Sequence, residues 1–308
     1  MPTLVDVRTP APRDVPASLA RGFAGAVVEV VDAGRACAFY REVLGFSDAG
    51  ASAEGPRLRI GDATLVLHEC DAPRTLPETG AHHAYRLPAA QLRAALERLA
   101  ERGTDVHRYR EDRAAEERSN VYCADPDGNR IQLVEGAPAG IDHAGIETHD
   151  MEWAEIYWTQ VLGGRVEGRV GWHMDDYERA IAWGAGQDER APGTRRWDKR
   201  YTTIEGQARL PRPNVQTFVT LAEGVTVAIF LATEHRQEPP RERWRGTPRL
   251  VFATSAQGLA DIERRLREVR LRCLASSDFG GPFIRDDAAI FARDTGGNFL
   301  EFRVDTPS

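Results

Sequence analysis

The sequence predicts an α+β fold in which four βαβββ modules pair into two half-barrel domains. Three repeats carry this prediction. The helix-like motif "FYREVLGF" at 39–46 returns 118 residues later as "YWTQVLGG" at 157–164. The closing motif "DPDGNRIQL" at 125–133 returns 169 residues later as "DTGGNFLEF" at 294–302. The amphipathic segment "QLRAALERLAERG" resembles "GLADIERRLREVR", 167 residues further on. Such fixed spacings indicate one structural unit used several times.

The repeats divide the chain into modules near 22–76, 80–136, 140–235 and 247–304. In the first module, "GAVVEVV" is rich in β-branched residues and predicts a strand. "DAGRACAFYREVLGF" has helical spacing and ends at a glycine, and "PRLRIGDATLVLHE" is typical of a hairpin. In the second, "HHAYRLP" predicts a strand, 91–102 an amphipathic helix, and "SNVYCADPDGNRIQLVE" a hairpin with a turn at Asp-Gly-Asn.

One such module cannot close a core, because its sheet leaves one face and two edges open. We therefore expect neighbouring modules to pair, giving one domain over 22–136 and a second over 140–304, after an N-terminal arm at 1–21. The third module carries an insertion at about 173–212, and all six tryptophans fall between Trp153 and Trp244. We interpret this segment as a lid that stacks on a flat ligand; a packing or dimer contact is the alternative.

Composition narrows the class of protein. The chain has 308 residues, a formal net charge of −7 and 42% hydrophobic residues, which is typical of a globular protein. A nucleic-acid or membrane partner would need a basic face, so neither is expected. Four scattered cysteines without a CxxC pair favour thiols in a reducing cytoplasm. We expect a cytoplasmic protein that binds a small molecule and can form a homodimer.

These repeated helices and "DPDGNxIxL"-like hairpins resemble the vicinal oxygen chelate superfamily. That superfamily includes glyoxalase I, bleomycin and fosfomycin resistance proteins and extradiol dioxygenases. The resemblance extends over nearly the whole chain after residue 22 and looks most like the two-domain dioxygenases. It implies a divalent metal (Fe²⁺, Mn²⁺ or Zn²⁺) that chelates substrate oxygens in the C-terminal domain. Dioxygenase, isomerase or lyase chemistry on an oxygen-rich, aromatic metabolite would follow.

Carried over position by position, the resemblance makes His143 and Glu301 the metal ligands. The alternation of a strand places Gly145 and Glu147 on the same face as His143. His173 or His235 could supply a third ligand. In the N-terminal domain only His82 and Gln132 stand at comparable places, and we expect that domain to be structural, with His82 and His83 as strand-edge or core histidines.

Two positions depart from the dioxygenase pattern. Arg249 stands where a second ligand histidine is expected, and Phe291 replaces a catalytic tyrosine. Arginine stays protonated and cannot ligate a metal, so Arg249 could instead pair with Glu301 through two hydrogen bonds. A metal-free binding or resistance protein, or a metal-independent enzyme using Glu301 and Arg249, is therefore the alternative. Catalytic candidates are Glu301, Arg249 and Tyr201; substrate-binding candidates are Trp172, His173, Tyr177, Phe291 and Arg285.

Overall fold

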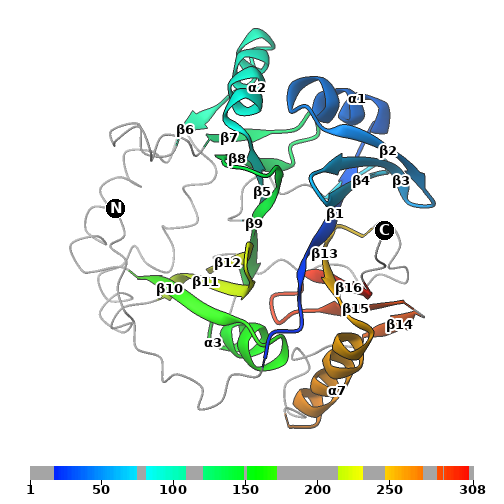
Figure 1. Ribbon diagram of the computed structural model, residues 1–308, viewed down its shortest axis with the longest axis vertical. Helices are drawn as coiled ribbons and strands as arrows, with labels where there is room; N and C mark the ends of the chain where they lie inside the picture. The colour runs from blue at the N-terminus through cyan, green and yellow to red at the C-terminus, as the bar shows by residue number, and fades with distance from the viewer. Residues whose placement is uncertain are drawn as a thin grey trace.

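The computed structural model describes residues 17–74, 81–108, 121–148, 151–171, 214–231, 247–272, 283–286 and 288–304. Four modules follow one another, each with a first strand, a helix and further strands (Figure 1). In modules 1 and 3 the helix continues into a π-helical turn, labelled η. Among the described helices, none is long and apolar enough to cross a membrane.

The first two modules contain the following elements. Module 1 has β1 (Gly22–Val30), α1 (Ala33–Ala38), η1 (Phe39–Val43), β2 (Ser47–Ser52), β3 (Gly55–Ile60) and β4 (Ala63–Glu69). Module 2 has β5 (His82–Leu87), α2 (Ala89–Glu101), β6 (His107–Arg108), β7 (Val121–Ala124) and β8 (Arg130–Glu135). Both expected hairpins are present, the first of them around Gly61 and Asp62.

The last two modules repeat the plan. Module 3 has β9 (Gly140–Thr148), α3 (Met151–Ile156), η3 (Tyr157–Val161), β10 (Arg165–Gly171), β11 (Asn214–Ala222) and β12 (Val225–Leu231). Module 4 has β13 (Arg249–Thr254), α7 (Ala256–Arg272), β14 (Ile284–Asp286), β15 (Ala289–Arg293) and β16 (Phe299–Val304). The insertion predicted at about 173–212 lies outside the described residues.

The strands form two eight-stranded sheets, and each sheet takes one module from either half of the chain. Sheet A has the order β10-β11-β12-β9-β5-β8-β7-β6, and sheet B has the order β14-β15-β16-β13-β1-β4-β3-β2. The central contacts are antiparallel pairs, β5 with β9 and β1 with β13. The two half-barrels are as expected. The expectation that modules 1 and 2, or 3 and 4, share a sheet is wrong; modules 2 and 3 share one, and modules 1 and 4 the other.

Consecutive modules are instead joined through their helices and closing turns. In modules 1 and 2, the Tyr40 hydroxyl donates to Asp125 at 3.1 Å, and Asn129 donates to the Glu29 carbonyl at 3.1 Å. The same two contacts recur in modules 3 and 4. Helices α1 and α2 accordingly lie together at one end of the molecule and α3 and α7 at the other (Figure 1).

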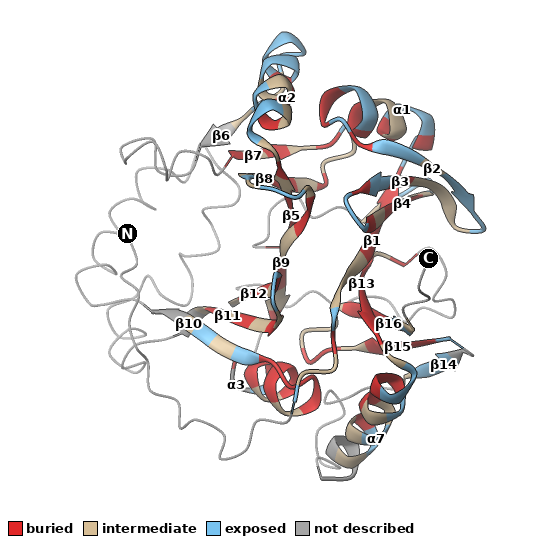
Figure 2. Ribbon diagram, in the orientation of Figure 1, coloured by how far each residue is buried: buried red, intermediate tan, exposed pale blue. Residues whose placement is uncertain are grey.

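In modules 3 and 4, the Trp158 indole donates to Asp294 at 3.3 Å and Asn298 donates to the Glu147 carbonyl at 2.8 Å. The "D-x-x-G-N" turns therefore fasten each helix to the following module. One face of each sheet packs on the helices in a contiguous apolar core, which appears red in Figure 2. The opposite face, which we call the inner face, carries the polar residues that form the candidate sites.

Candidate functional site

Strand β9 alternates between the core and the inner face of sheet A. Ala144 and Ile146 are buried in the apolar core, whereas His143 and Glu147 are only half-buried. Because successive side chains of a strand point to opposite faces, His143, Gly145 and Glu147 share the inner face, as predicted. Strand β5 alternates in the same way: Tyr85 packs in the apolar core, whereas His82 lies on the inner face.

Three nitrogen and oxygen donors converge at the centre of this inner face. The His82 and His143 Nε2 atoms lie 3.2 Å apart, and the Gln132 Oε1 atom lies 3.1 Å from His143 Nε2. The antiparallel pairing of β5 with β9 creates this cluster, because it brings the first strands of modules 2 and 3 side by side. Gln132 joins from β8, where it lies opposite Ala84.

The carboxylate of Asp142 forms a hydrogen bond with the His143 imidazole on the side away from the donor cluster. The His143 Nδ1 atom lies 2.8 Å from Asp142 Oδ2, and Arg86 lies 3.5 Å from the other Asp142 oxygen. The hydrogen bond from His143, followed by the charges of His143 and Arg86, holds the pKa of Asp142 below its usual value. An ionised Asp142 accepts the Nδ1 proton. In the neutral form of the His143 imidazole, this hydrogen bond keeps the proton on Nδ1, and the lone pair of Nε2 faces the inner face.

This donor set fits a divalent metal ion. Two ligand atoms at ~2.1 Å from one ion and roughly 90–109° apart stand about 3.0–3.4 Å from each other, close to the spacings here. Imidazoles with an amide oxygen suit borderline ions such as Zn²⁺, Fe²⁺ and Mn²⁺. Within the described ranges no three His, Cys, Asp or Glu side chains form such a group. The Gln132 amide is the candidate third donor, through its contact with His143. Ala228, opposite Gly145 on β12, adds no donor.

Aromatic and charged side chains surround the donors. The ring of His82 lies 5.6 Å from that of Tyr122 and 5.9 Å from that of Phe230. The guanidinium of Arg130 lies 4.9 Å from the centre of the Tyr122 ring. Burial lowers the pKa of Arg130, and the nearby Tyr122 and Glu147 act in the opposite direction. The site therefore has flat apolar walls with one cation and one carboxylate close by.

His83, the neighbour of His82, has a different role. It points to the other side of β5, is 8% exposed, and its ring lies 6.4 Å from that of Tyr85. Burial lowers the pKa of His83 to about 4, so this imidazole is neutral in the folded core. Both histidines are buried, as expected, but His82, which is 3% exposed, contacts His143 and so belongs to the donor cluster.

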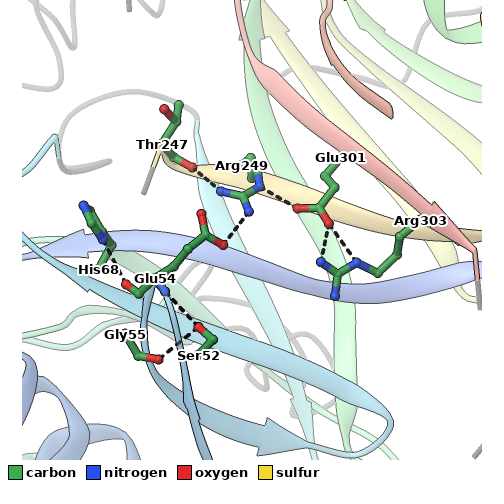
Figure 3. Close-up of polar contacts among 8 residues, drawn as sticks. All are labelled: Ser52, Glu54, Gly55, His68, Thr247, Arg249, Glu301 and Arg303. Atoms are coloured by element: carbon green, nitrogen blue, oxygen red, sulfur yellow. Dashed lines mark hydrogen bonds and ion pairs between the residues drawn. The ribbon is translucent and has the colours of Figure 1, made fainter. Parts of the chain in front are cut away.

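The inner face of sheet B carries an ion-pair network at the corresponding place (Figure 3). Arg249 Nε donates to Glu301 Oε2 at 2.7 Å, and a second Arg249 nitrogen donates to Glu54 Oε2 at 2.7 Å. Arg303 donates to the other Glu301 oxygen through Nε at 2.7 Å and through its terminal nitrogen. The expected pairing of Arg249 with Glu301 is confirmed, with one hydrogen bond in place of two.

Burial alone would lower the pKa of Arg249, but the hydrogen bonds and charges of Glu54 and Glu301 together raise it. The Phe291 ring lies 5.4 Å below the same guanidinium. Phe291 and Glu301 are opposite one another on β15 and β16. Of the residues expected at one site, Arg249, Glu301 and Phe291 are thus together.

The metal site expected from His143 and Glu301 is not formed by these two residues. His143 lies on β9 of sheet A and Glu301 on β16 of sheet B, and each has its partners within its own sheet. The error has a physical cause: the expected site assumed that modules 3 and 4 share a sheet. Because module 3 instead shares its sheet with module 2, the partners of His143 are His82 and Gln132. The repeat spacing aligns these two residues with Arg249 and Glu301.

The remaining candidates are distributed as follows. Arg285 forms an ion pair of 3.2 Å with Glu263 of α7, and the substrate-binding role expected of it stays a prediction. Tyr201, Trp172, His173, Tyr177 and His235 lie outside the described residues. Sequence reasoning missed Asp142, since an acidic neighbour of a candidate ligand is common and gives no separate signal.

Comparison with known proteins agrees with the fold. Residues 23–133 match the model of the Glyoxalase/Bleomycin resistance protein/Dioxygenase superfamily. A proposed dioxygenase from Bacillus subtilis subsp. subtilis str. 168 is 14% identical with a TM-score of 0.57, over 95% of this chain and 87% of its own. Glyoxalase I from Zea mays is 15% identical with a TM-score of 0.56, over 92% of both chains. No curated protein matches the sequence.

The fold is thus that of vicinal oxygen chelate proteins. The likeness to solved structures shows the fold, while the match over residues 23–133 connects the first part of the chain to the superfamily by sequence. The resemblance inferred from the repeated motifs is confirmed. The superfamily contains glyoxalases and dioxygenases, so the activity itself has to be argued from the site.

Proposed function

We propose that this protein is a metal-dependent enzyme that acts on a small, oxygen-rich aromatic molecule at the inner face of sheet A. His82, His143 and Gln132 would hold a divalent cation. The observation that carries the proposal is the spacing of 3.2 Å and 3.1 Å between their donor atoms. The proposal keeps His143 as a ligand and moves its partners from Glu301 to the residues that β5 and β8 provide.

The donor set favours isomerase or lyase chemistry over dioxygenation. Two imidazoles and an amide are all neutral, so the full charge of a bound divalent ion would remain available to polarise substrate oxygens. The facial triad typical of iron oxygenases has a carboxylate in place of the amide. Glu147, on the same face of β9 as His143, is the candidate proton acceptor for a carbon acid next to the polarised oxygens.

The chain's own residues would position the substrate. Tyr122 and Phe230 flank His82 on two sides and can stack on a planar ring. Arg130, between Tyr122 and Glu147, can neutralise an anionic substituent. Asp142 would keep the Nε2 lone pair of His143 directed at the inner face, through the hydrogen bond at 2.8 Å.

Metal analysis of protein purified without chelator tests the proposal. We expect about one divalent ion per chain in the wild-type protein and loss of that ion in His82→Ala and in His143→Ala, because each variant removes one of three donors. Gln132→Ala should weaken binding less, since an amide is the weakest of the three ligands.

His68→Ala is the matched control. His68 lies in sheet B, where its Nδ1 donates to the Glu54 carbonyl at 2.9 Å. This variant should retain the ion, as should Arg303→Gln, which changes the network of sheet B. Stoichiometric metal that persists in both His82→Ala and His143→Ala would contradict the assignment of the site.

A metal-free binding protein that sequesters an aromatic metabolite is the second candidate. The ion pair of Arg249 with Glu301 favours it, because that pair replaces metal ligands on the inner face of sheet B. Metal-free wild-type protein that binds an aromatic ligand tightly without turnover supports this candidate. Turnover that is lost with EDTA and restored by a divalent ion supports the enzyme.

A further inference from the structure

The ion-pair network of sheet B contains two cations and two anions, and its centre, Arg249 with Glu301, is buried. Arg249 and Arg303 face Glu301 and Glu54 (Figure 3). The Glu301 side chain is fully buried and that of Arg249 is 3% exposed, whereas Glu54 is 17% exposed. Without Glu54, the other three charges would leave one excess positive charge beside Arg249. Arg303 is 50% exposed and is stabilised by solvent, whereas the buried Arg249 would be left to share the single carboxylate of Glu301 with it. An anion beside Arg249 is therefore favourable.

Glu54 differs from the other three residues in origin. Arg249 comes from β13, and Glu301 and Arg303 from β16, two adjacent strands. Glu54 comes from the turn between β2 and β3, which lies at the far edge of the sheet. The curl of the half-barrel brings this turn over the inner face, 195 residues away from Arg249 in sequence.

The turn holds Glu54 by its backbone. Its amide donates to the Ser52 hydroxyl at 3.2 Å, and its carbonyl accepts from His68. The carboxylate therefore reaches Arg249 as a group presented by a loop, and its bond to the guanidinium is one that any carboxylate can make. The Glu54 side chain is also the more exposed of the two carboxylates that contact Arg249.

From this geometry we propose that the inner face of sheet B is a binding site for small-molecule carboxylates centred on Arg249, and that Glu54 occupies it as an internal ligand. The ligand carboxylate takes the place of the Glu54 carboxylate on Arg249, and the ring of Phe291 supports the guanidinium from below. The inference is independent of the metal site, which lies in sheet A and shares none of these residues.

Chemical rescue provides the test. Glu54→Ala removes a CH₂–COO⁻ group, which has the size and charge of acetate. Acetate binding to the full-length chain is measured by calorimetry, with chloride as the balancing anion. We expect Glu54→Ala to bind acetate at least tenfold more tightly than wild type, because the tethered carboxylate no longer competes at an effective concentration in the millimolar range or above.

Two further variants make the result specific. Glu42→Ala removes a carboxylate from an exposed ion pair of 2.8 Å with Arg102 and should bind acetate no better than wild type. Glu54→Ala combined with Arg249→Met should lose the binding gained by Glu54→Ala. Acetate binding that survives the loss of Arg249, or that equals wild type in Glu54→Ala, overturns the proposal.

Wild type should still show saturable binding, at least tenfold weaker than in Glu54→Ala. Wild type is titrated with acetate to about a hundredfold the concentration that saturates Glu54→Ala. If wild type shows no saturation in this range, Glu54 forms a fixed structural ion pair with Arg249 that acetate does not displace. If Glu54→Ala is incompletely folded, the circular dichroism signal regained in acetate serves as the readout. Equal recovery in acetate and in chloride would again overturn the proposal.

Discussion

Asp142 determines which nitrogen of His143 is available to a ligand. Its carboxylate accepts the Nδ1 proton at 2.8 Å and is itself paired with Arg86 at 3.5 Å. A carboxylate behind an imidazole fixes the tautomer and the ring orientation, and it raises the basicity of the other nitrogen. Asp142 therefore acts on the proposed metal site through His143.

Asp142→Asn should weaken divalent-metal affinity by about 10–100-fold while leaving the fold intact. The amide keeps the size of the side chain but no longer stabilises positive charge on the imidazole. Chelator competition measures the affinity, and Asp62→Asn, in the exposed β3–β4 turn, is the control. Equal affinities of Asp142→Asn and wild type would show that the carboxylate does not tune His143.

The carboxyl group of Asp294 has a pKa that makes the stability of the fold depend on pH. The carboxylate is buried under η3, where it accepts from the amides of Gly296 and Asn298 and from the Trp158 indole. Burial raises the pKa of Asp294 from 3.8 to about 6, although these hydrogen bonds act to lower it. The folded chain consequently holds this proton at pH values where the unfolded chain has released it.

Because of Asp294, the free energy of unfolding should therefore fall as pH rises from about 4 to about 6. Above pH 6 the folded chain carries the full cost of the buried, ionised carboxylate. A shift of about two units corresponds to roughly 3 kcal/mol at most. Denaturant unfolding at pH 4.5 and pH 7 measures the difference, and Asp294→Asn should reduce it. If the variant keeps the same pH dependence as wild type, the titration belongs to another group.

At the scale of single elements, the β2–β3 hairpin depends on two glycines in very different surroundings. Gly55 has a φ of +138°, and a Cβ there would lie 2.0 Å from the Leu67 carbonyl oxygen. Gly50 has a φ of +81° with open space around it. Both positions disfavour side chains through their backbone angles, but only Gly55 is also in close contact with the neighbouring strand.

Gly50→Ala should cost about 1–2 kcal/mol, the ordinary cost of a left-handed residue. Gly55→Ala should cost roughly 3 kcal/mol or more, since the β3–β4 pair must also move apart. Urea unfolding of both variants measures this difference. Equal losses in the two variants would mean that the hairpin relaxes around the added methyl group, and that Glu54 is presented by a pliable turn.

Elements also show how far sequence reasoning extends. Period-2 alternation correctly placed His143 and Glu147 on one face of β9, and the repeat spacing correctly aligned His82 with Arg249. Neither observation predicts which strand lies beside β9. The first strands of the four modules have similar patterns, so exchange of their partners leaves every side chain on the same face. Only the long-range pairing of β5 with β9 revealed that His82 and His143 share a site.

At the scale of the molecule, the four modules form a closed ring of contacts. Sheets join modules 2 with 3 and 1 with 4, while helices and closing turns join modules 1 with 2 and 3 with 4. Neither half of the chain contains a complete sheet. The bounds 22–136 and 140–304 stay a prediction as domains, but the interlocked contacts imply that the halves unfold together.

A fragment that ends at residue 136 should consequently have no stable monomer. It would expose the edges of β1 and β5, which pair with β13 and β9 in the whole chain, and unpaired edges associate. Since β5 is the repeat counterpart of β13, β1 of one copy can pair with β5 of another and complete two sheets at once. Sedimentation equilibrium should find folded dimers whose stability rises with protein concentration. A folded monomer with a concentration-independent unfolding transition would show instead that modules 1 and 2 complete a domain through their helices and closing turns alone.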